Sequence, residues 1–241
     1  MYILIDLGGT NLRIASTETL EKPAITKVQT HKLTKDYQID YAWLKDRIKE
    51  YSEKQKISGI AMAAPGTFDR NRKVLIPGTF SVEWIEKPFA EELEDMFDCK
   101  MYVENDGVVG ALGEYEYGEP KDYKFICLTW GTGIGGALVV DGWPDKLDQK
   151  EYRDQIEKAC GGKYLEEKYG DLSKLDDKTW NEIVKEFARE LEILKKKLDV
   201  EEIVVGGGIT FKRQKDLEKA GIKVSKLGEN INLYGCCALI K

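Results

Sequence analysis

An asparagine and an aspartate stand side by side where an apolar segment ends. Asn105 and Asp106 follow the residues MYVE and precede the small-residue segment GVVGALGEYEYG, which is expected to be a helix. A carboxylate at the end of a strand can accept a proton from an attacking hydroxyl, and an amide beside it offers a donor and an acceptor that can orient the substrate. The pair is equally suited to cap the following helix, and capping and proton transfer are compatible roles.

A second carboxylate, Asp6, lies near the end of the first predicted strand, just before a glycine-rich turn. The turn contains Gly8, Gly9, Thr10 and Asn11. Backbone N–H groups of glycine can approach an anion because no Cβ stands in the way, and a hydroxyl can add a hydrogen bond. A carboxylate at the end of such a strand holds hydrated Mg²⁺ rather than phosphate. The segment predicts a site for magnesium and phosphate, with a simple tight turn as the alternative.

A match to a dinucleotide-binding motif is rejected. Gly131, Gly133 and Gly136 fit the spacing G-x-G-x-x-G, but that motif requires a helix whose N-terminal N–H groups bind the pyrophosphate. The residues that follow are ALVVDG, with β-branched side chains and no helical spacing, so we expect a strand and no dinucleotide site. No G-x-x-x-x-G-K-[ST] segment occurs either, which leaves a glycine turn that can approach an anion.

The predicted elements that carry these residues alternate between strand and helix. In the first half, strands are expected at YILIDL, NLRIAS, ITKVQTHKL, ISGIAMAA and MYVEN, and helices at IDYAWLKDRIKEYSEK, KPFAEELEDMF and GVVGALGEYEYG. In the second half, YKFICLTW, GALVVDG and EEIVV are expected to be strands, and roughly 152–168 and 178–197 helices. This alternation predicts an α/β fold.

Two of these segments share one plan. YILIDLGGTNLRIAS and FICLTWGTGIGGALVV each have an apolar strand, a turn of glycine and threonine, and a second strand. Such an internal repeat favours two related domains that face a shared cleft. The alternative is that glycine hairpins are common and the likeness has no structural meaning.

Composition narrows the class of protein and its partners. The chain has 241 residues, 42% of them apolar, which is enough to bury the core of one large or two modest domains. Its formal net charge of −6 gives no broad attraction for nucleic acid or an anionic membrane, so small-molecule partners are expected. The five cysteines form no C-x-x-C pair, and no apolar run reaches the ~20 residues of a membrane helix. We therefore expect a cytoplasmic protein with reduced thiols and no secretion signal.

Five segments, taken in order, resemble the motifs of the ROK family of sugar kinases, within the actin-like and hexokinase-like ATPase superfamily. They are DLGGTNLRIA, AAPGTFD, VENDGVVGALGE, LTWGTGIGGALVVDG and IVVGGGIT. The resemblance implies two actin-like, ribonuclease-H-like α/β domains with a nucleotide cleft between them. It also implies a glucokinase-like enzyme that uses ATP and Mg²⁺ and transfers the γ-phosphate to a hydroxyl of a hexose or a related polyol.

The resemblance also implies roles for individual residues. Asp106 would be the general base, and Asn105 and the backbone N–H of Gly66 would bind the sugar. The first glycine turn would bind phosphate, and Asp6 would hold Mg²⁺ through water. The other residues implied for ATP are Thr132 and Gly133 at the phosphates and Gly206, Gly207 and Gly208 at the adenosine. Glycines at the last position let the backbone lie flat against a base or a ribose.

The sugar-binding half of the site departs from the family. Relatives usually have Glu-x-x-Gly-His and then a cysteine-rich zinc motif, whereas the single histidine here, His31, lies in an N-terminal strand. Only Cys160 matches a zinc cysteine, so no structural zinc is expected, because tetrahedral zinc needs about four ligands. Glu166 matches a glutamate that bonds sugar hydroxyls, and Phe80 stands where relatives often have asparagine. Three acidic residues could replace the lost contacts or could simply face solvent: Asp145, Asp148 and Glu151.

The resemblance suggests a first domain at 1–108, joined by a C-terminal helix within about 228–241, and a second domain at 109–227. A non-catalytic nucleotide or sugar sensor is the alternative function, because the sugar-binding histidine is missing. A ROK repressor is disfavoured, because repressors carry an N-terminal DNA-binding domain and this chain begins at its first predicted phosphate-binding strand. Homodimers are frequent among ROK relatives, which makes a homodimer the assembly to test.

Overall fold

The fold is described from a computed structural model at residues 1–76, 82–119, 124–147 and 154–241. Phe80, Asp148 and Glu151 lie outside the described residues. The chain divides into two compact units, which we call unit 1 (Met1–Val109 and Asn232–Lys241) and unit 2 (Gly110–Ile231). The expected boundaries at 108 and about 228 stay a prediction about separately folding domains.

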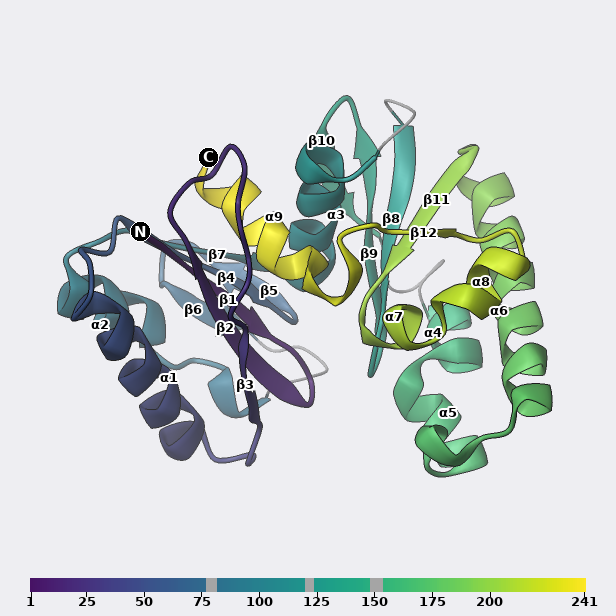
Figure 1. The fold of residues 1–241 in the computed structure, drawn as a ribbon, viewed down its shortest axis with the longest axis horizontal. Helices are drawn as coiled ribbons and strands as arrows, with labels where there is room; N and C mark the ends of the chain where they lie inside the picture. Colours follow the sequence, from purple (N-terminus) through teal and green to yellow (C-terminus); the bar gives the residue numbers. More distant parts are fainter. Residues whose placement is uncertain (77–81, 120–123, 148–153) are drawn as a thin grey trace. The chain divides into compact units, whose positions relative to one another are not determined.

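Unit 1 is built on a sheet with the strand order β3-β2-β1-β4-β7 in the described residues (Figure 1). Its strands are β1 (Tyr2–Leu7), β2 (Asn11–Thr17), β3 (Gln29–Lys32), β4 (Gly59–Ala64) and β7 (Met101–Asn105). The first three form antiparallel pairs, whereas β4 runs parallel to both β1 and β7. Central parallel strands are buried on both faces, which explains why the run GIAMAA in β4 has no polar residue and is buried throughout.

Helices cover both faces of this sheet. Helices α1 (Tyr37–Ser52) and α2 (Phe89–Phe97) pack on one face, and α9 (Ile231–Ile240) lies on the other (Figure 1). Alternate residues of the central strand contribute to the α1 and α2 side of the core, among them Ile3, Ile5 and Leu7. A short hairpin, β5 (Thr67–Asp69) and β6 (Val74–Ile76), and the 3₁₀ turn η1 (Val82–Trp84) complete the unit.

The only histidine of the chain serves unit 1 as a structural residue. His31 Nε2 lies 2.8 Å from Oδ1 of the buried Asp40, and its ring stacks on Trp43 with 4.9 Å between the centroids. The backbone N–H and the hydroxyl of Thr34 also donate to Asp40. This network holds the segment that joins β3 to α1. The predicted strand ITKVQTHKL is correspondingly shortened to QTHK.

Unit 2 repeats the plan of unit 1, with the strand order β10-β9-β8-β11-β12 in its described residues. Its strands are β8 (Lys124–Trp130), β9 (Ile134–Val140), β10 (Trp143–Lys146), β11 (Glu202–Gly206) and β12 (Lys223–Val224). An antiparallel hairpin again adds a third antiparallel strand on one side and a parallel neighbour, β11, on the other. The structure therefore supports the internal repeat that the two glycine hairpins indicate in the sequence.

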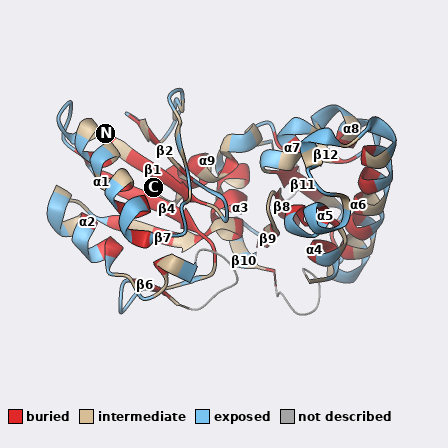
Figure 2. Ribbon diagram, turned by 90° about the horizontal axis from the view of Figure 1, so that it is seen from below, coloured by how far each residue is buried: buried red, intermediate tan, exposed pale blue. Residues whose placement is uncertain are grey.

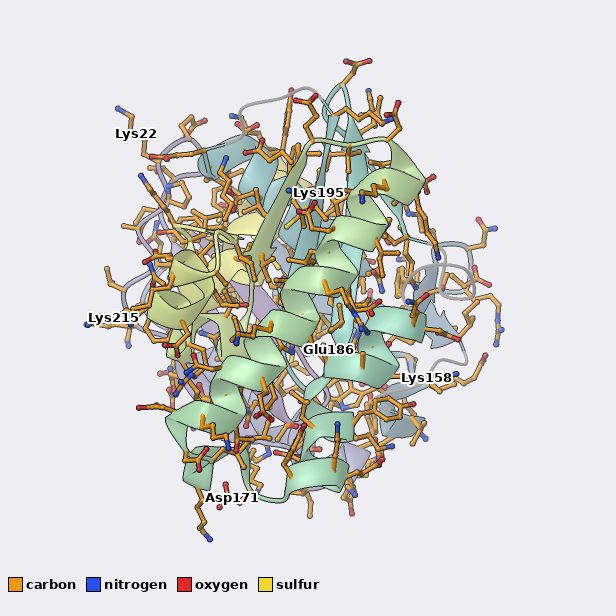
Figure 3. All side chains as sticks on the ribbon, turned by 90° about the vertical axis from the view of Figure 1, so that its right-hand side faces the viewer. Lys22, Lys158, Asp171, Glu186, Lys195 and Lys215 are labelled. Carbon is orange, nitrogen blue, oxygen red and sulfur yellow. The ribbon has the colours of Figure 1, made fainter. Side chains whose placement is uncertain are left out.

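The helices of unit 2 bury an apolar face of this sheet. They are α4 (Asp154–Cys160), α5 (Gly162–Tyr169), α6 (Asp177–Leu198), α7 (Gly208–Lys212) and α8 (Gln214–Lys219), with the 3₁₀ turns η3 (Leu172–Lys174) and η4 (Gly228–Asn230). The indole of Trp130 stacks on Phe187 of α6 with 4.1 Å between the ring centroids. The outer side of α6 carries charged side chains such as Glu186 and Lys195 (Figure 3), while its inner side is buried (Figure 2).

The helix predicted at about 152–168 is two helices in the structure, because the chain turns at Gly161 between α4 and α5. The expected strand after the rejected dinucleotide motif is confirmed as β9, which pairs with β8 along its whole length. A mixed α/β fold is likewise confirmed. Among the described residues, no helix combines the length and the apolar character that crossing a membrane requires.

Helix α3 (Asp106–Tyr117) carries a buried carboxylate into unit 2. Glu114 is 1% exposed, and its Oε2 accepts a hydrogen bond of 2.5 Å from the hydroxyl of Ser225. Burial raises the pKa of the Glu114 carboxyl, while the Ser225 hydrogen bond and the charge of Lys223 act against that rise. The folded protein therefore keeps a proton on Glu114 at pH values where the unfolded chain has lost it.

This difference predicts a pH-dependent cost in stability. As the pH rises from the ordinary glutamate value of 4.5 through the raised pKa, the unfolded chain loses its proton first, so the Glu114 contribution to stability falls. Glu114→Gln does not titrate and should gain thermal stability relative to the wild type between about pH 4 and pH 7. Melting temperatures across that range measure the effect. A difference between the two proteins that does not change with pH would contradict it.

Candidate functional site

Asp6 is buried near the end of β1, where three groups define its surroundings. Its Oδ1 accepts a hydrogen bond of 3.0 Å from Nδ2 of Asn232, and its Oδ2 lies 3.5 Å from Nη1 of Arg13, the residue opposite it on β2. Burial raises the pKa of the Asp6 carboxyl, and the Asn232 hydrogen bond and the Arg13 charge partly offset that rise. Both oxygens of the carboxylate thus have neighbouring donors.

The glycine turn that follows is a tight hairpin between β1 and β2. The N–H of Gly8 donates to the carbonyl of Asn11 at 2.9 Å, and the carbonyl of Thr10 accepts from the N–H of Leu33 at the same distance. Gly9, Thr10 and Asn11 are exposed at the tip. The structure therefore presents this turn at the surface of unit 1, as a phosphate-binding loop requires. That it binds phosphate stays a prediction.

Asn105 and Asp106 stand at the junction of β7 and α3. Nδ2 of the buried Asn105 donates to the carbonyl of Gly66 at 2.8 Å, and its Oδ1 accepts from the N–H of Gly107 at 3.1 Å. Oδ1 of Asp106 also accepts from the Gly107 N–H, at 2.9 Å. Asn105 directly precedes α3 and accepts from its second residue, which is the capping interaction expected as the alternative, while Asp106 accepts from the N–H next to it. Asp106 remains partly exposed, so its role at the start of the helix is compatible with proton transfer from a substrate hydroxyl.

Gly66 takes a conformation that favours glycine, with φ of +95°. Because its carbonyl accepts from Asn105, the loop after β4 is tied to the end of β7. The first observable role of Asn105 is thus to position this loop. The sequence motif predicts a sugar contact for Asn105, and nothing in its local sequence indicates the link to Gly66.

These residues of unit 1 meet at one edge of its sheet. In the parallel arrangement of β1, β4 and β7, Asp6 pairs with Ala63, and Ala64 pairs with Asn105. Asp6, the loop with Gly66, and the Asn105–Asp106 pair therefore lie at the carboxyl ends of three neighbouring parallel strands. Ligands of open α/β sheets bind at such edges.

The second glycine turn belongs to unit 2 and is anchored by a helix. The N–H of Gly162 donates to the carbonyl of Gly131 at 3.0 Å, and the N–H of Lys163 donates to the carbonyl of Thr132 at 2.7 Å. The first two residues of α5 thus hold the turn in place through its carbonyl groups. Thr132 and Gly133 are partly exposed and keep their predicted role at the phosphates as a hypothesis.

The three glycines after β11 differ in what surrounds them. A Cβ on Gly206 would lie 2.8 Å from Cδ1 of Ile231, and one on Gly207, which has φ of +99°, would lie 2.7 Å from the carbonyl oxygen of Trp130. Nothing lies within 4 Å of the corresponding position at Gly208. Packing within unit 2 therefore accounts for the first two glycines, and only Gly208 offers an open backbone surface. The adenosine role of all three stays a prediction.

Glu166 lies on the exposed side of α5. Cys160 is buried, its carbonyl accepts a hydrogen bond of 2.7 Å from the indole of Trp130, and burial raises the pKa of its thiol to about 12. A buried thiol with a raised pKa stays protonated, and Cys160 therefore belongs to the hydrophobic core of unit 2. Within the described ranges, no three or more His, Cys, Asp or Glu side chains gather in a way that could hold a metal.

Comparison with known proteins gives the family. The ROK family model matches residues 2–146, so the chain belongs to the ROK family. A glucokinase of Streptomyces coelicolor is 28% identical over 145 residues, which cover 58% of this chain and 44% of that protein. An N-acetyl-D-glucosamine kinase of Aliivibrio salmonicida is 31% identical over 146 residues, which cover 59% and 47%. The chain spans about half the length of the curated relatives it matches.

Solved structures agree on the fold. A ROK glucokinase from Streptomyces griseus, in complex with glucose and AMPPNP, superposes with a TM-score of 0.77 at 18% identity, over 99% of this chain and 98% of that one. A polyphosphate/ATP-glucomannokinase from Arthrobacter gives a TM-score of 0.78 at 18% identity, over 98% and 96%. The family also contains regulators, since a xylose repressor of Caldicellulosiruptor bescii is 24% identical over 143 residues, 57% of this chain and 36% of that protein.

Proposed function

We propose that this chain is an ATP-dependent sugar kinase that transfers the γ-phosphate of ATP to a hydroxyl of a hexose or a related polyol. The observation that carries the proposal is the arrangement in unit 1, where Asp6, Gly66 and Asp106 lie at the carboxyl ends of neighbouring parallel strands. The family match supports it, because the ROK family model covers residues 2–146, a range that includes all three residues, and a glucokinase is among the relatives. A cytoplasmic location and small-molecule partners go with this function, and a homodimer is the assembly to test.

In this proposal Asp106 is the general base. Its carboxylate would accept the proton of the attacking hydroxyl, while phosphoryl transfer otherwise depends on positioning and charge neutralisation. Asn105 would hold the Gly66 loop, whose backbone N–H would contact the sugar. The turns at 8–11 and at Thr132 and Gly133 would supply N–H and hydroxyl donors to the phosphates, and the segment 206–208 would lie against the adenosine.

Magnesium fits Asp6 in its hydrated form. Both carboxylate oxygens already have a donor nearby, Asn232 on one side and Arg13 on the other, so water would bridge the carboxylate and the ion. Mg²⁺ keeps several waters in protein sites and is often held by one or two carboxylates together with substrate phosphates. When bound, the ion would neutralise charge on the phosphates. The proposal needs no zinc.

The proposed function is tested by measuring ADP release across a panel of hexoses, N-acetylhexosamines, pentoses and polyols. We expect Mg²⁺-dependent ADP release with at least one acceptor. A non-catalytic nucleotide or sugar sensor is the second candidate, because the sugar-binding histidine of the family is missing and one relative is a repressor. ADP at background with every acceptor, together with intact nucleotide binding, would favour the sensor.

The assignment of Glu166 is tested separately. Glu166→Ala should raise the KM for the accepted sugar about 10-fold or more, because a hydrogen bond between a charged group and the substrate contributes about 1.5–3 kcal/mol. The KM for ATP should stay unchanged. The neighbouring Glu167→Ala is the matched control, since that residue is also exposed on α5. An effect confined to the KM for ATP would show that Glu166 does not bind the sugar.

A further inference from the structure

Asn232 joins the C-terminal helix to the strand that carries Asp6. It lies in the first turn of α9, and its Nδ2 donates to Asp6 Oδ1 over a separation of 226 residues in the sequence. Figure 1 shows α9 running along the sheet of unit 1. The other oxygen of the carboxylate faces Arg13 at 3.5 Å, which is a long contact for a hydrogen bond. The amide of Asn232 therefore makes the shorter of the two contacts on Asp6.

The other end of the same amide is unpaired. Among the described residues, Oδ1 of Asn232 is buried without a hydrogen-bond partner. Rotating the amide by 180° would not help, because it would bring its oxygen against an oxygen of the Asp6 carboxylate. A buried acceptor without a partner is destabilising, because it loses its hydrogen bonds to water and gains none in the folded protein.

The unpaired oxygen indicates that the Asn232 amide does more than anchor α9 to the sheet. If Asn232 served only to anchor α9, an apolar side chain of similar size would do so without an unpaired oxygen, as its neighbours do. Leu233, Cys236 and Cys237 of the same helix are buried, and the Cys236 thiol donates to the carbonyl of Ile5 in β1 at 3.3 Å. What a leucine at 232 could not provide is the N–H donor for Asp6.

We propose that Asn232 is a positioning residue that fixes the rotation of the Asp6 carboxylate for binding a magnesium–nucleotide complex. The proposal rests on the function proposed above for Asp6. Because Asn232 acts through Asp6, it should matter for nucleotide with Mg²⁺ and not for nucleotide alone. It should also have no effect once Asp6 can no longer serve as the metal's partner.

The test is a double-mutant cycle read by calorimetric titration with AMPPNP, with and without Mg²⁺. Asn232→Leu should weaken binding of Mg-AMPPNP about 10-fold, which corresponds to ~1.4 kcal/mol, and leave binding of metal-free AMPPNP unchanged. In the Asp6→Asn background, Asn232→Leu should have no further effect. Cys237→Ala is the control and should bind Mg-AMPPNP as the wild type does. It alters a buried residue of α9 whose thiol, in the described structure, bonds only within the helix.

The melting temperature separates positioning from anchoring. Asn232→Leu removes an unpaired buried oxygen and also one donor to the buried Asp6 carboxylate, and these two effects oppose each other, so its melting temperature should stay near the wild-type value. Equal losses with and without Mg²⁺, or an undiminished effect in the Asp6→Asn background, would overturn the proposal. If the leucine variant does not fold, Asn232→Ala replaces it in the same cycle. If the affinity of the wild-type protein for AMPPNP does not depend on Mg²⁺, both this inference and the proposed metal site are overturned. If the wild type shows that dependence but Asn232→Leu binds Mg-AMPPNP as tightly as the wild type, only this inference is overturned.

Discussion

Asp106→Asn is expected to lower the turnover number with the accepted sugar about 10²-fold or more. A general base contributes about 10²–10⁴-fold to a rate, and an amide cannot accept the proton of the attacking hydroxyl. The substitution preserves shape, and the amide oxygen can still accept the hydrogen bond that Asp106 Oδ1 now receives from the Gly107 N–H. The cap of α3 should therefore survive, so that the loss reports on chemistry and not on folding.

Steady-state kinetics and nucleotide titration measure this effect together. The affinity for Mg-ATP should stay near the wild-type value, because the base acts on the proton of the acceptor. Asp46→Asn is the matched control, since it makes the same chemical change at an exposed position of α1 and should leave turnover unchanged. Turnover retained in Asp106→Asn would remove this carboxylate from the mechanism.

Gly235→Ala is expected to destabilise the protein by about 3 kcal/mol or more. In an exposed helix the same change would stabilise by about 1 kcal/mol, because alanine is the better helix former. At this site, however, the new Cβ would lie 1.8 Å from the carbonyl oxygen of Val109 in α3. Both atoms belong to backbone or are fixed to it, so α9 and the first turn of α3, which both lie in unit 1, would have to move apart.

Thermal and denaturant unfolding measure this loss. Gly59→Ala is the control, because a Cβ at that buried glycine of β4 would make only ordinary contacts of 3.6 Å and longer. We expect Gly59→Ala to change the melting temperature much less than Gly235→Ala. Equal melting temperatures for Gly235→Ala and the wild type would show that α3 and α9 do not approach each other this closely.

Much of the fold could be predicted because the strands are strongly patterned. The apolar runs YILIDL, GIAMAA and FICLTW have few alternatives to buried strands, and the β-branched residues after Gly136 exclude the helix that a dinucleotide site requires. The strand patterns and the glycines that follow then place Asp6 and Asp106 near the carboxyl ends of strands. Boundaries were less predictable, since one glycine, Gly161, divides a single helical pattern into α4 and α5.

The contacts that support the candidate site could not be predicted locally. Asn105 bonds to Gly66, which is 39 residues away, and Asn232 bonds to Asp6 from the far end of the chain. Neither partner carries a signal in its own segment, because both bonds arise only when distant strands and helices pack. Gly206 and Gly207 have a packing reason within unit 2 in addition to their predicted role at the adenosine, and their sequence motif alone does not indicate it.

The most direct test of the proposed kinase mechanism is a crystal structure of the chain with Mg-AMPPNP and an accepted sugar. Our account predicts phosphates in contact with the turn at 8–11 and with Thr132 and Gly133, and a sugar hydroxyl about 3 Å from the Asp106 carboxylate. A carboxylate that points away from the sugar, or that packed side chains separate from every sugar hydroxyl, would contradict it.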